Sequence, residues 1–338
     1  MEKTYSNLTV SSSPHLVTKL DTQKTMMWVL IALAPSLLVS VFVFGPRVLV
    51  LTAVCIAASM FFEWAYEKLM KRPDTVKDLS AAVTGTLIAF NVPATFPLWM
   101  AIIGCFVAIV LVKQLYGGLG RNFANPAIVA RIMLLVSFAT QMTTWPVART
   151  MVPMMPGLEA TDVVTGATPL AILGEGGAFN ELPSLMDMFL GFIGGSVGEV
   201  SSIALIIGGC ILIWKKIISP ATPVAFIGTV FVFALIYYAV KPVEGASAIQ
   251  MALFHILAGG VMLGAIFMAT DYVTSPIMPL GKILMGIGCG LFTMIIRLFA
   301  GYPEGVSFSI LLMNIITPLI DMLCLRLEYG GGAKKKDE

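Results

Sequence analysis

The sequence is poor in charge, because only 12% of its 338 residues are Asp, Glu, Lys or Arg. Soluble domains carry about 25% charged residues, so this scarcity argues against a soluble domain. The formal net charge of +2 leaves no basic field that would favour a nucleic-acid partner. Hydrophobic residues make up 58% of the chain, and the mean hydropathy is +0.91. The composition predicts a polytopic protein of the lipid bilayer and excludes nucleic-acid binding.

Residues that hold metals and redox clusters are also scarce. The chain has two histidines, His15 and His255, and five cysteines, none of which forms a Cys-x-x-Cys pair. Histidine-based metal sites, haem and iron–sulfur clusters all need more of these ligands in closer groups. No Gly-x-Gly-x-x-Gly turn stands between a strand and a helix, as a βαβ dinucleotide site requires. We therefore expect no metal site, and we expect NAD and iron–sulfur chemistry to lie on partner subunits.

Long apolar runs divide the chain into ten predicted transmembrane segments. About 20 residues of helix cross the hydrocarbon core, and the lack of strict alternation argues against a β-barrel. The third segment ends in Asn-Val-Pro and the sixth contains GFIGGSVGEVSS, so we expect both to be interrupted. The segments cover residues 25–44, 47–69, 79–92, 97–116, 125–145, 186–213, 219–240, 246–269, 280–300 and 306–326.

The distribution of Lys and Arg predicts the orientation. These residues gather before the first segment, after the second, after the sixth and at the C-terminus, which the positive-inside rule places in the cytoplasm. The acidic stretch between the fifth and sixth segments then lies outside. The predicted organisation is a cytoplasmic segment 1–24, five helices in 25–145, an outer loop 146–185, five helices in 186–326 and a cytoplasmic tail 327–338.

The two sets of five segments resemble each other weakly. Gly104-Cys105 corresponds to Gly288-Cys289, and Lys113 corresponds to Arg297, at one offset of about 184 residues. An odd number of spans inverts the second copy. The pattern therefore predicts two inverted repeats with the functional centre at their interface.

Several ionisable residues lie in or at the edges of the predicted spans, where burial is costly unless they are paired. Lys113 and Arg297 are candidates to hold a phosphate, a carboxylate or an internal acid, with snorkelling and internal ion pairing as the alternative. Glu199 and Asp321 are candidates for an ion pathway, and a structural role is the alternative for Glu199. The full set is Lys113, Arg131, Glu199, Asp271, Arg297 and Asp321.

Two polar stretches flank these charges. GGLGRNFANPA at 117–127 contains Arg121, Asn122 and Asn125, and Asn125-Pro126 predicts a capped helix start. A helix start of this kind can hold an anion, and a plain capped turn is the alternative. ATDYVTSP at 269–276 contains Asp271, Thr274 and Ser275, which either cap helices or line a polar site.

The outer loop contains DVVTGATPL at 162–170. Pro169 keeps Thr168 extended, and Gly166 and Ala167 add little bulk, so a second enzyme could close around the segment. The Thr168 hydroxyl is then a candidate for esterification by a phosphate-bearing group. An ordinary turn is the alternative, because Thr and Gly are common in turns.

Residues 162–168 resemble the flavinylation motif Asp-x-x-(Ser/Thr)-Gly-Ala-(Ser/Thr), and nearly the whole chain resembles the NqrB/RnfD family of membrane flavoprotein subunits. Thr165 stands where many relatives have Ser, an exchange that keeps the hydroxyl. The short polar N-terminus favours the RnfD branch over NqrB. The other stretches that carry the resemblance are SSPHL at 12–16, GGLGRNFANPA at 117–127, GGSVGEVSS at 194–202 and FMATDYVTSP at 267–276.

The resemblance implies a ten-helix, two-repeat fold like that of urea transporters. It implies that a flavin transferase joins FMN to Thr168 through a phosphodiester, with Asp162, Thr165, Gly166 and Ala167 as the rest of the motif. A noncovalent riboflavin is also implied, as are the partner subunits RnfA, RnfB, RnfC, RnfE and RnfG. The implied function is electron relay between ferredoxin and NAD, coupled to movement of Na⁺ or H⁺.

Three other functions stay open. One is an NqrB-like subunit of a sodium-pumping NADH:quinone reductase. The second is a channel or carrier of the same fold without redox chemistry, and the third is a membrane anchor for other subunits.

Overall fold

Helices dominate the structure, a computed structural model that describes residues 21–148, 152, 164–176, 179, 182–243, 245–300 and 304–327. Two of the elements, η2 and η4, are π-helices that continue a preceding helix. In chain order the elements are α1 (Thr22–Phe44), α2 (Arg47–Leu69), η1 (Val76–Asp78), α3 (Ser80–Phe90), α4 (Leu98–Phe106), η2 (Val107–Gln114), α5 (Pro126–Ser137), α6 (Ala139–Met142), β1 (Trp145–Pro146), β2 (Thr165–Gly166), α7 (Pro169–Gly174), α8 (Leu185–Leu190), α9 (Ser202–Trp214), α10 (Ala221–Val240), α11 (Ala248–Leu257), α12 (Val261–Leu263), η4 (Gly264–Met268), α13 (Pro279–Phe299) and α14 (Val306–Leu325).

Within the described residues, five helices are long and apolar enough to cross a membrane. These are α1, α2, α10, α13 and α14, and the bent pair of α11 with α12–η4 makes a sixth if it counts as one span. The chain is therefore a multi-pass helical membrane protein, as its composition predicts. Shorter apolar helices are α3, α4 with η2, α5 and α9.

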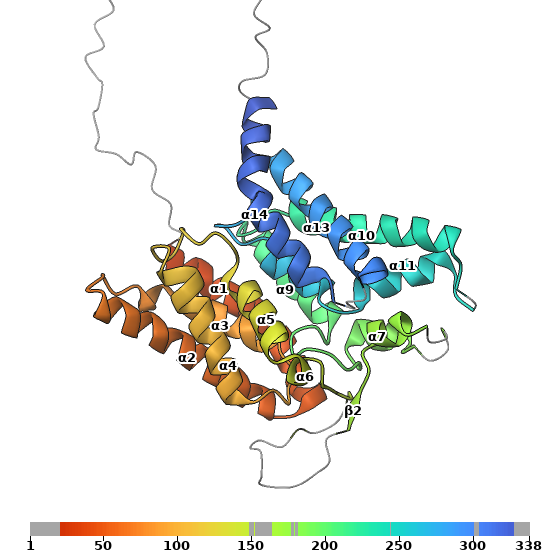
Figure 1. Ribbon diagram of the computed structural model, residues 1–338, viewed down its shortest axis with the longest axis horizontal. Coiled ribbons are helices and arrows are strands. Elements are labelled where there is room, and N and C mark those ends of the chain that lie inside the picture. Colours follow the sequence, from red (N-terminus) through yellow and green to blue (C-terminus); the bar gives the residue numbers. More distant parts are fainter. Residues whose placement is uncertain are drawn as a thin grey trace, which may run out of the picture.

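The helices form two groups that lie side by side (Figure 1). In the first group α2 packs on α3 and α4, and in the second α10 packs on α11 and α13. The groups meet where α1 packs on α9 and where α5 packs on α14. Gly208 makes the first crossing close, because a Cβ atom there would overlap the carbonyl oxygen of Ala32.

Several helices are broken inside the bundle. The interruption predicted within 186–213 is present, because α8 ends at Gly191 with φ 113° and α9 begins only at Ser202. The third segment also ends early, at Phe90. The amide of Gly198 donates to the Phe90 carbonyl at 2.8 Å, so backbone groups freed at one break form a hydrogen bond with those freed at the other. The 63° bend between α11 and α12 was not predicted.

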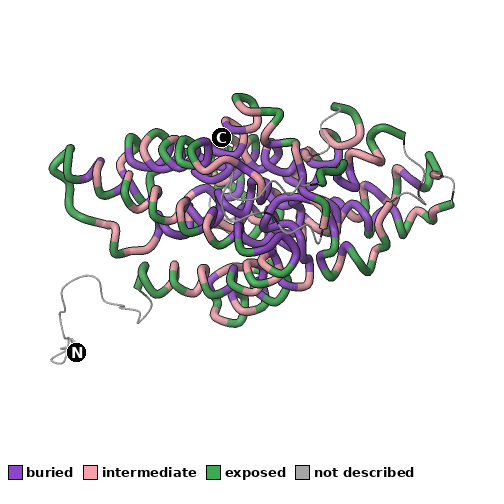
Figure 2. Tube along the Cα trace, turned by 90° about the horizontal axis from the view of Figure 1, so that it is seen from below, coloured by how far each residue is buried: buried purple, intermediate pink, exposed green. Residues whose placement is uncertain are grey.

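Buried residues concentrate in the centre, and the outward faces of the helices are exposed (Figure 2). Many large apolar side chains lie on those faces; Phe42 of α1 and Leu69 of α2 are 81% and 80% exposed. A surface of this kind suits contact with lipid rather than water.

The bundle has two ends. We call one the lysine end; it contains the turns 70–79, 115–122, 215–219 and 270–278. A hydrogen bond joins two segments at this end, because Nη1 of Arg72 donates to the Gln114 carbonyl at 3.1 Å. We call the other the threonine end; it contains the loops 91–97, 138–147 and 164–176. At the threonine end β1 and β2 form a short antiparallel pair, with Trp145 opposite Gly166.

Candidate functional site

Thr168 begins the short helix α7 at the threonine end. Its backbone is extended, with φ −69° and ψ 155°, as Pro169 predicts. Its Oγ1 accepts a hydrogen bond from the Ala171 amide at 3.2 Å, and the residue is only 7% exposed. The hydroxyl that the sequence led us to expect at the surface is therefore buried, because it caps the helix.

The rest of the motif lies next to this cap. Thr165 and Gly166 form β2 and are exposed, as is Ala167. An exposed two-residue strand before a capped threonine gives another protein access to the segment from one side. Asp162 lies outside the described residues.

A small cavity connects Thr168 with a group of buried charges. Its wall contains Thr168, Leu170 and Gly259 together with the carboxylates Glu199 and Glu304. The candidate modification site and these two carboxylates therefore border one space.

Arg131 of α5 is the centre of these charges. Its Nη1 donates to Glu199 Oε1 at 3.0 Å and to Asn91 Oδ1 at 2.7 Å, and its Nη2 pairs with Glu304. Only 5% of the Arg131 side chain and 3% of the Glu199 side chain are exposed. A Cβ atom at Gly260 would lie 2.5 Å from Glu199 Oε1, so the turn between α11 and α12 also closes on this group.

Arg131, inside α5, thus binds groups from three helix ends or breaks: Asn91 after α3, Glu199 before α9 and Glu304 before α14. Two carboxylates share one guanidinium, and the charge of Arg297 also acts on both of them. Glu304 lies in the loop before α14, where burial raises the pKa of its carboxyl to about 7 although Arg131 opposes the shift. Sequence reasoning missed Glu304 and Asn91, because neither is an ionisable residue within an apolar run.

Arg297 does not hold an internal acid directly. Its Nη1 donates to the His255 carbonyl at 2.6 Å and its Nη2 to the Ala258 carbonyl at 2.9 Å. These carbonyls end α11, so the arginine caps the broken helix.

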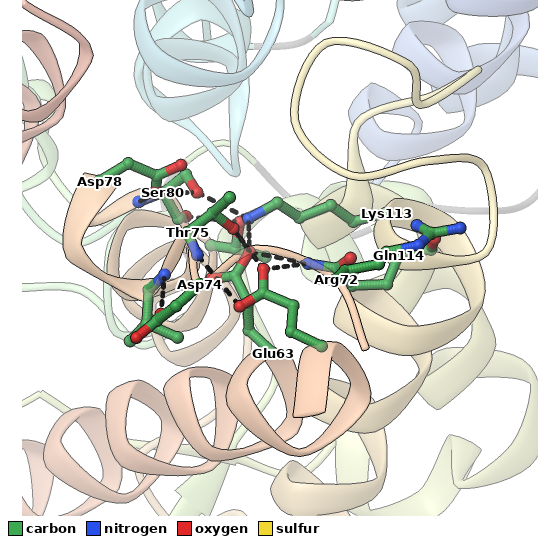
Figure 3. Close-up of polar contacts among 11 residues, drawn as sticks. Glu63, Arg72, Asp74, Thr75, Asp78, Ser80, Lys113 and Gln114 are labelled. Atoms are coloured by element: carbon green, nitrogen blue, oxygen red, sulfur yellow. Dashed lines mark hydrogen bonds and ion pairs between the residues drawn. The ribbon is translucent and has the colours of Figure 1, made fainter. Parts of the chain in front are cut away.

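At the lysine end, Lys113 forms the internal ion pair that the sequence left open as the alternative. Its Nζ lies 2.5 Å from Glu63 Oε1 and 2.6 Å from Ser80 Oγ. Figure 3 shows the two charged side chains pointing toward each other between α2 and the η2 helix. Gln114 Nε2 also donates to Glu63, at 2.9 Å. Glu63 was missed, although Glu63 and Glu67 share a helix face at i and i+4.

The two polar stretches meet in one cavity at the lysine end. Lys113, Asn122, Asn125 and Asp271 all line it. The rest of its wall combines apolar side chains of α1, α3, α9 and η4 with hydroxyl side chains, among them Ser80, Thr84 and Thr270. Asn125 caps α5 as predicted, with Oδ1 accepting from Ala127, and its Nδ2 donates to the Met268 carbonyl at 3.1 Å.

A second cavity of about 670 Å³ adjoins the first and shares Asp271 with it. Ser275 and Asp321 line this second space. Thr274 is buried and donates to Asp271 Oδ2 at 3.2 Å. Burial raises the pKa of Asp271, which is outside the spans, and the hydrogen bond from Thr274 opposes the shift.

Two candidates lie apart from the charges around Arg131. Arg121 is exposed and lines neither lysine-end cavity. Asp321 accepts a hydrogen bond from the Ile277 amide at 3.1 Å, so it fastens the start of α13 at the lysine end. The structure therefore does not bring Asp321 together with Glu199. Within the described part of the chain no group of three His, Cys, Asp or Glu is placed to hold a metal ion.

The fold and these groups define a multi-pass helical membrane protein with charged side chains buried where its helices break. Residues 9–330 match the NQR2, RnfD, RnfE family, and the chain belongs to that family.

Relatives match over almost the full length. The chain is 47% identical over 333 residues to the D component of the Na⁺-translocating ferredoxin:NAD⁺ oxidoreductase complex of Acetobacterium woodii, covering 98% of each chain. It is 40% identical to the D component of the proton-translocating ferredoxin:NAD⁺ oxidoreductase complex of Clostridium ljungdahlii, covering 95% of this chain and 96% of that one. It is 37% identical to the D component of the ion-translocating oxidoreductase complex of Stutzerimonas stutzeri, covering 93% of each.

Proposed function

We propose that the chain is a membrane subunit of an ion-translocating ferredoxin:NAD oxidoreductase and relays electrons through a flavin bound covalently to Thr168. The observation that carries the proposal is the segment Asp162–Thr168, which has the form of a flavinylation motif, in a chain that matches such subunits end to end. The names of these relatives favour this function over a quinone reductase subunit or a non-redox carrier. The partners are the other subunits of the Rnf complex and a flavin transferase.

The proposed topology is ten crossings in two inverted repeats, 25–145 and 186–326. Five long helices, the bent pair and four shorter apolar helices make up the ten. The packing of α2 on α3 and α4 parallels that of α10 on α11 and α13, which supports the repeat. The lysine end and both termini are cytoplasmic, and the threonine end is outside in the cell membrane of a prokaryote.

The residues around Thr168 fit attachment if α7 opens first. The exposed Thr165–Ala167 segment gives a flavin transferase its recognition strand, while the Oγ1 atom must leave its cap. Loss of such a cap costs about 1 kcal/mol, so the six-residue helix α7 can release the hydroxyl at a small cost in stability. The flavin supplies reversible electron transfer, and the chain sets its position and surroundings.

The lysine-end cavities are the proposed site of a noncovalent riboflavin. Apolar walls suit a flat ring system, and Asn122, Asn125 and Asp271 offer amide and carboxylate partners at one side. Glu199, held by Arg131, is the proposed ion-pathway residue, since it is a buried acid that borders the small cavity at Thr168. Asp321 is proposed to act only at the lysine-end entrance.

Fluorescence of the denatured protein tests the covalent attachment. The chain is expressed with a flavin transferase and run on a denaturing gel, and we expect a band that fluoresces under ultraviolet light. Thr168→Val should abolish the band, and Thr168→Ser should keep it. Thr143→Val is the matched control and should keep the band, because Thr143 is an exposed threonine at the same end of the bundle that lies outside the motif. A persistent band in Thr168→Val would contradict the assignment of the anchor.

A further inference from the structure

The helix α9 ends at the lysine end with a tryptophan that is followed by two lysines, Trp214, Lys215 and Lys216. Nζ of Lys215 lies 4.6 Å from the centre of the Trp214 ring and 4.4 Å from the centre of the Trp28 ring, which belongs to α1. One ammonium group therefore contacts indole rings from two neighbouring helices. We call Trp28, Trp214, Lys215 and Lys216 the α9 cation cluster.

The backbone at the end of α9 places the second lysine where glycine is usual. The Lys216 amide donates to the Ile213 carbonyl and the Ile217 amide to the Leu212 carbonyl, both at 2.9 Å, which is the pattern of a Schellman turn. The left-handed position of this turn is usually Gly, because other residues adopt it at a cost, but here it is Lys216 with φ 55°. The turn itself does not require a lysine, so we expect the charge to have a role of its own.

The helix α2 ends in the same way at the same end of the bundle. Lys71 has φ 54° at the corresponding position of a second such turn, in which the Arg72 amide donates to the Glu67 carbonyl at 2.8 Å. One turn earlier, Nζ of Lys68 lies 4.8 Å from the centre of the Trp64 ring. An indole, an ammonium over it and a lysine with left-handed backbone thus occur twice at the lysine end, which indicates that both helix ends meet the same surroundings.

The protein surface that leads to the α9 cation cluster is apolar. Trp214 is the last residue of α9 and is 76% exposed, and Ile207, two turns earlier on the same helix, is also exposed. On α1, Ile31 lies one turn after Trp28 and is exposed as well. Apolar side chains, then indole rings and then ammonium groups follow one another toward the lysine end. Acyl chains, the interface and charged headgroups follow in the same order in one leaflet of a bilayer.

Two other roles for these lysines explain less of the arrangement. A lysine at the C-terminus of a helix interacts favourably with the helix dipole, but this does not account for indole rings from two helices. An internal acid would account for a buried ammonium, but among the described residues no carboxylate forms an ion pair with Lys215. An aromatic ring attracts an ammonium group through its face and leaves the N–H groups on the other side for an anion.

We propose that the α9 cation cluster binds the headgroup of an anionic phospholipid, with Lys215 and Lys216 at the phosphate and the acyl chains along the exposed faces of α1 and α9. The lipid belongs to the leaflet at the lysine end, which is the cytoplasmic leaflet in the proposed topology. Each lysine attracts the negative headgroup, and the indole rings exclude water beside it, which strengthens the attraction. The bound lipid also bridges α1 and α9, whose contact joins the two groups of helices.

Quenching of Trp214 fluorescence by brominated lipids tests this proposal. Full-length protein is placed in nanodiscs of phosphatidylcholine that contain a fixed fraction of lipid with brominated acyl chains, either phosphatidylglycerol or phosphatidylcholine. Each form of the protein is measured with and without Trp214→Phe, and the difference isolates Trp214 from the other tryptophans. The double variant Lys215→Gln with Lys216→Gln removes both charges. Lys77→Gln is the matched control, because Lys77 is an exposed lysine at the same end of the bundle.

We expect the unmodified sequence to prefer phosphatidylglycerol over phosphatidylcholine beside Trp214 on the order of tenfold, since two lysines act on the headgroup. The double variant should lose this preference, and its quenching by brominated phosphatidylcholine should persist, because Trp214 still faces lipid. Lys77→Gln should keep the preference. Equal quenching by the two lipids in the unmodified sequence would overturn the proposal, and so would a preference that survives in the double variant.

A second arm separates a lipid headgroup from a free anion of the same chemistry. Chloride is exchanged for inorganic phosphate at constant ionic strength, and the preference for phosphatidylglycerol should not change. Loss of the preference in phosphate would show that the α9 cation cluster takes up the free anion, and it would overturn the assignment to a lipid.

Discussion

Replacing Lys113 with Met removes the charge that neutralises Glu63 inside the bundle. The two side chains are 3% and 0% exposed, and Nζ lies 2.5 Å from Oε1. Thr75 Oγ1 and Gln114 Nε2 also donate to the carboxylate, but neither carries a charge. The variant therefore leaves an acid in a nearly water-free site.

Loss of one partner of a buried pair costs about 3–5 kcal/mol, while replacing both by neutral side chains of similar size is often neutral. Lys113→Met should therefore lower the ratio of folded to unfolded protein by about two to four orders of magnitude. Glu63→Gln alone should cost a comparable amount, because it leaves the ammonium unpaired. The double variant Lys113→Met with Glu63→Gln should recover most of the loss.

Unfolding in detergent mixtures with increasing dodecyl sulfate, followed by circular dichroism, measures these differences. Lys77→Met is the control, because Lys77 is exposed at the same end of the bundle. A double variant as unstable as the Lys113→Met single variant would show that packing, and not charge pairing, sets the cost. A Lys113→Met protein as stable as the unmodified sequence would refute the reasoning altogether.

The loop carboxyl of Glu304 should ionise as pH rises through about 7, so its pair with Arg131 weakens as pH falls below that value. Infrared difference spectra should show a band of a protonated carboxyl group that fades as pH rises through neutral and that is missing in Glu304→Gln. An unchanged band in that variant would show that the band belongs to another carboxyl group. Gly208→Ala should destabilise the protein by at least about 1–3 kcal/mol, because the new methyl group overlaps the Ala32 carbonyl at the contact of α1 with α9. Gly228→Ala, in α10 with no atom within 4 Å of its added Cβ, should be neutral or stabilising, and equal melting temperatures for the two variants would contradict this account of the crossing.

The positions of the helices followed closely from the sequence. Hydrophobic runs of about 20 residues predicted α1, α2, α10, α13 and α14 to within a few residues of their ends, because lipid contact requires such runs. The break before α9 was also readable, since Gly191 and its neighbours cannot sustain a lipid-exposed helix. The bend between α11 and α12 was not readable, because the glycines at 259 and 260 stand inside an otherwise continuous apolar run.

The partners of the buried charges were harder to predict than the charges themselves. Lys113 and Glu199 were identified because an ionisable residue in an apolar run is costly. Their partners lie 50 and 68 residues away in the chain, so only the folded packing reveals Glu63 and Arg131 as those partners. Thr168 shows the same limit, since the motif predicts a flavin attachment there, whereas only the structure shows that its hydroxyl caps a helix.

The mass of the peptide that contains Thr168, taken from protein matured with its flavin transferase, tests the central claim most directly. The account predicts that this peptide carries one added FMN, joined as a phosphodiester, and that fragmentation places the group on the Thr168 side chain. A peptide of unmodified mass from protein that still supports ferredoxin-dependent reduction of NAD would contradict the account.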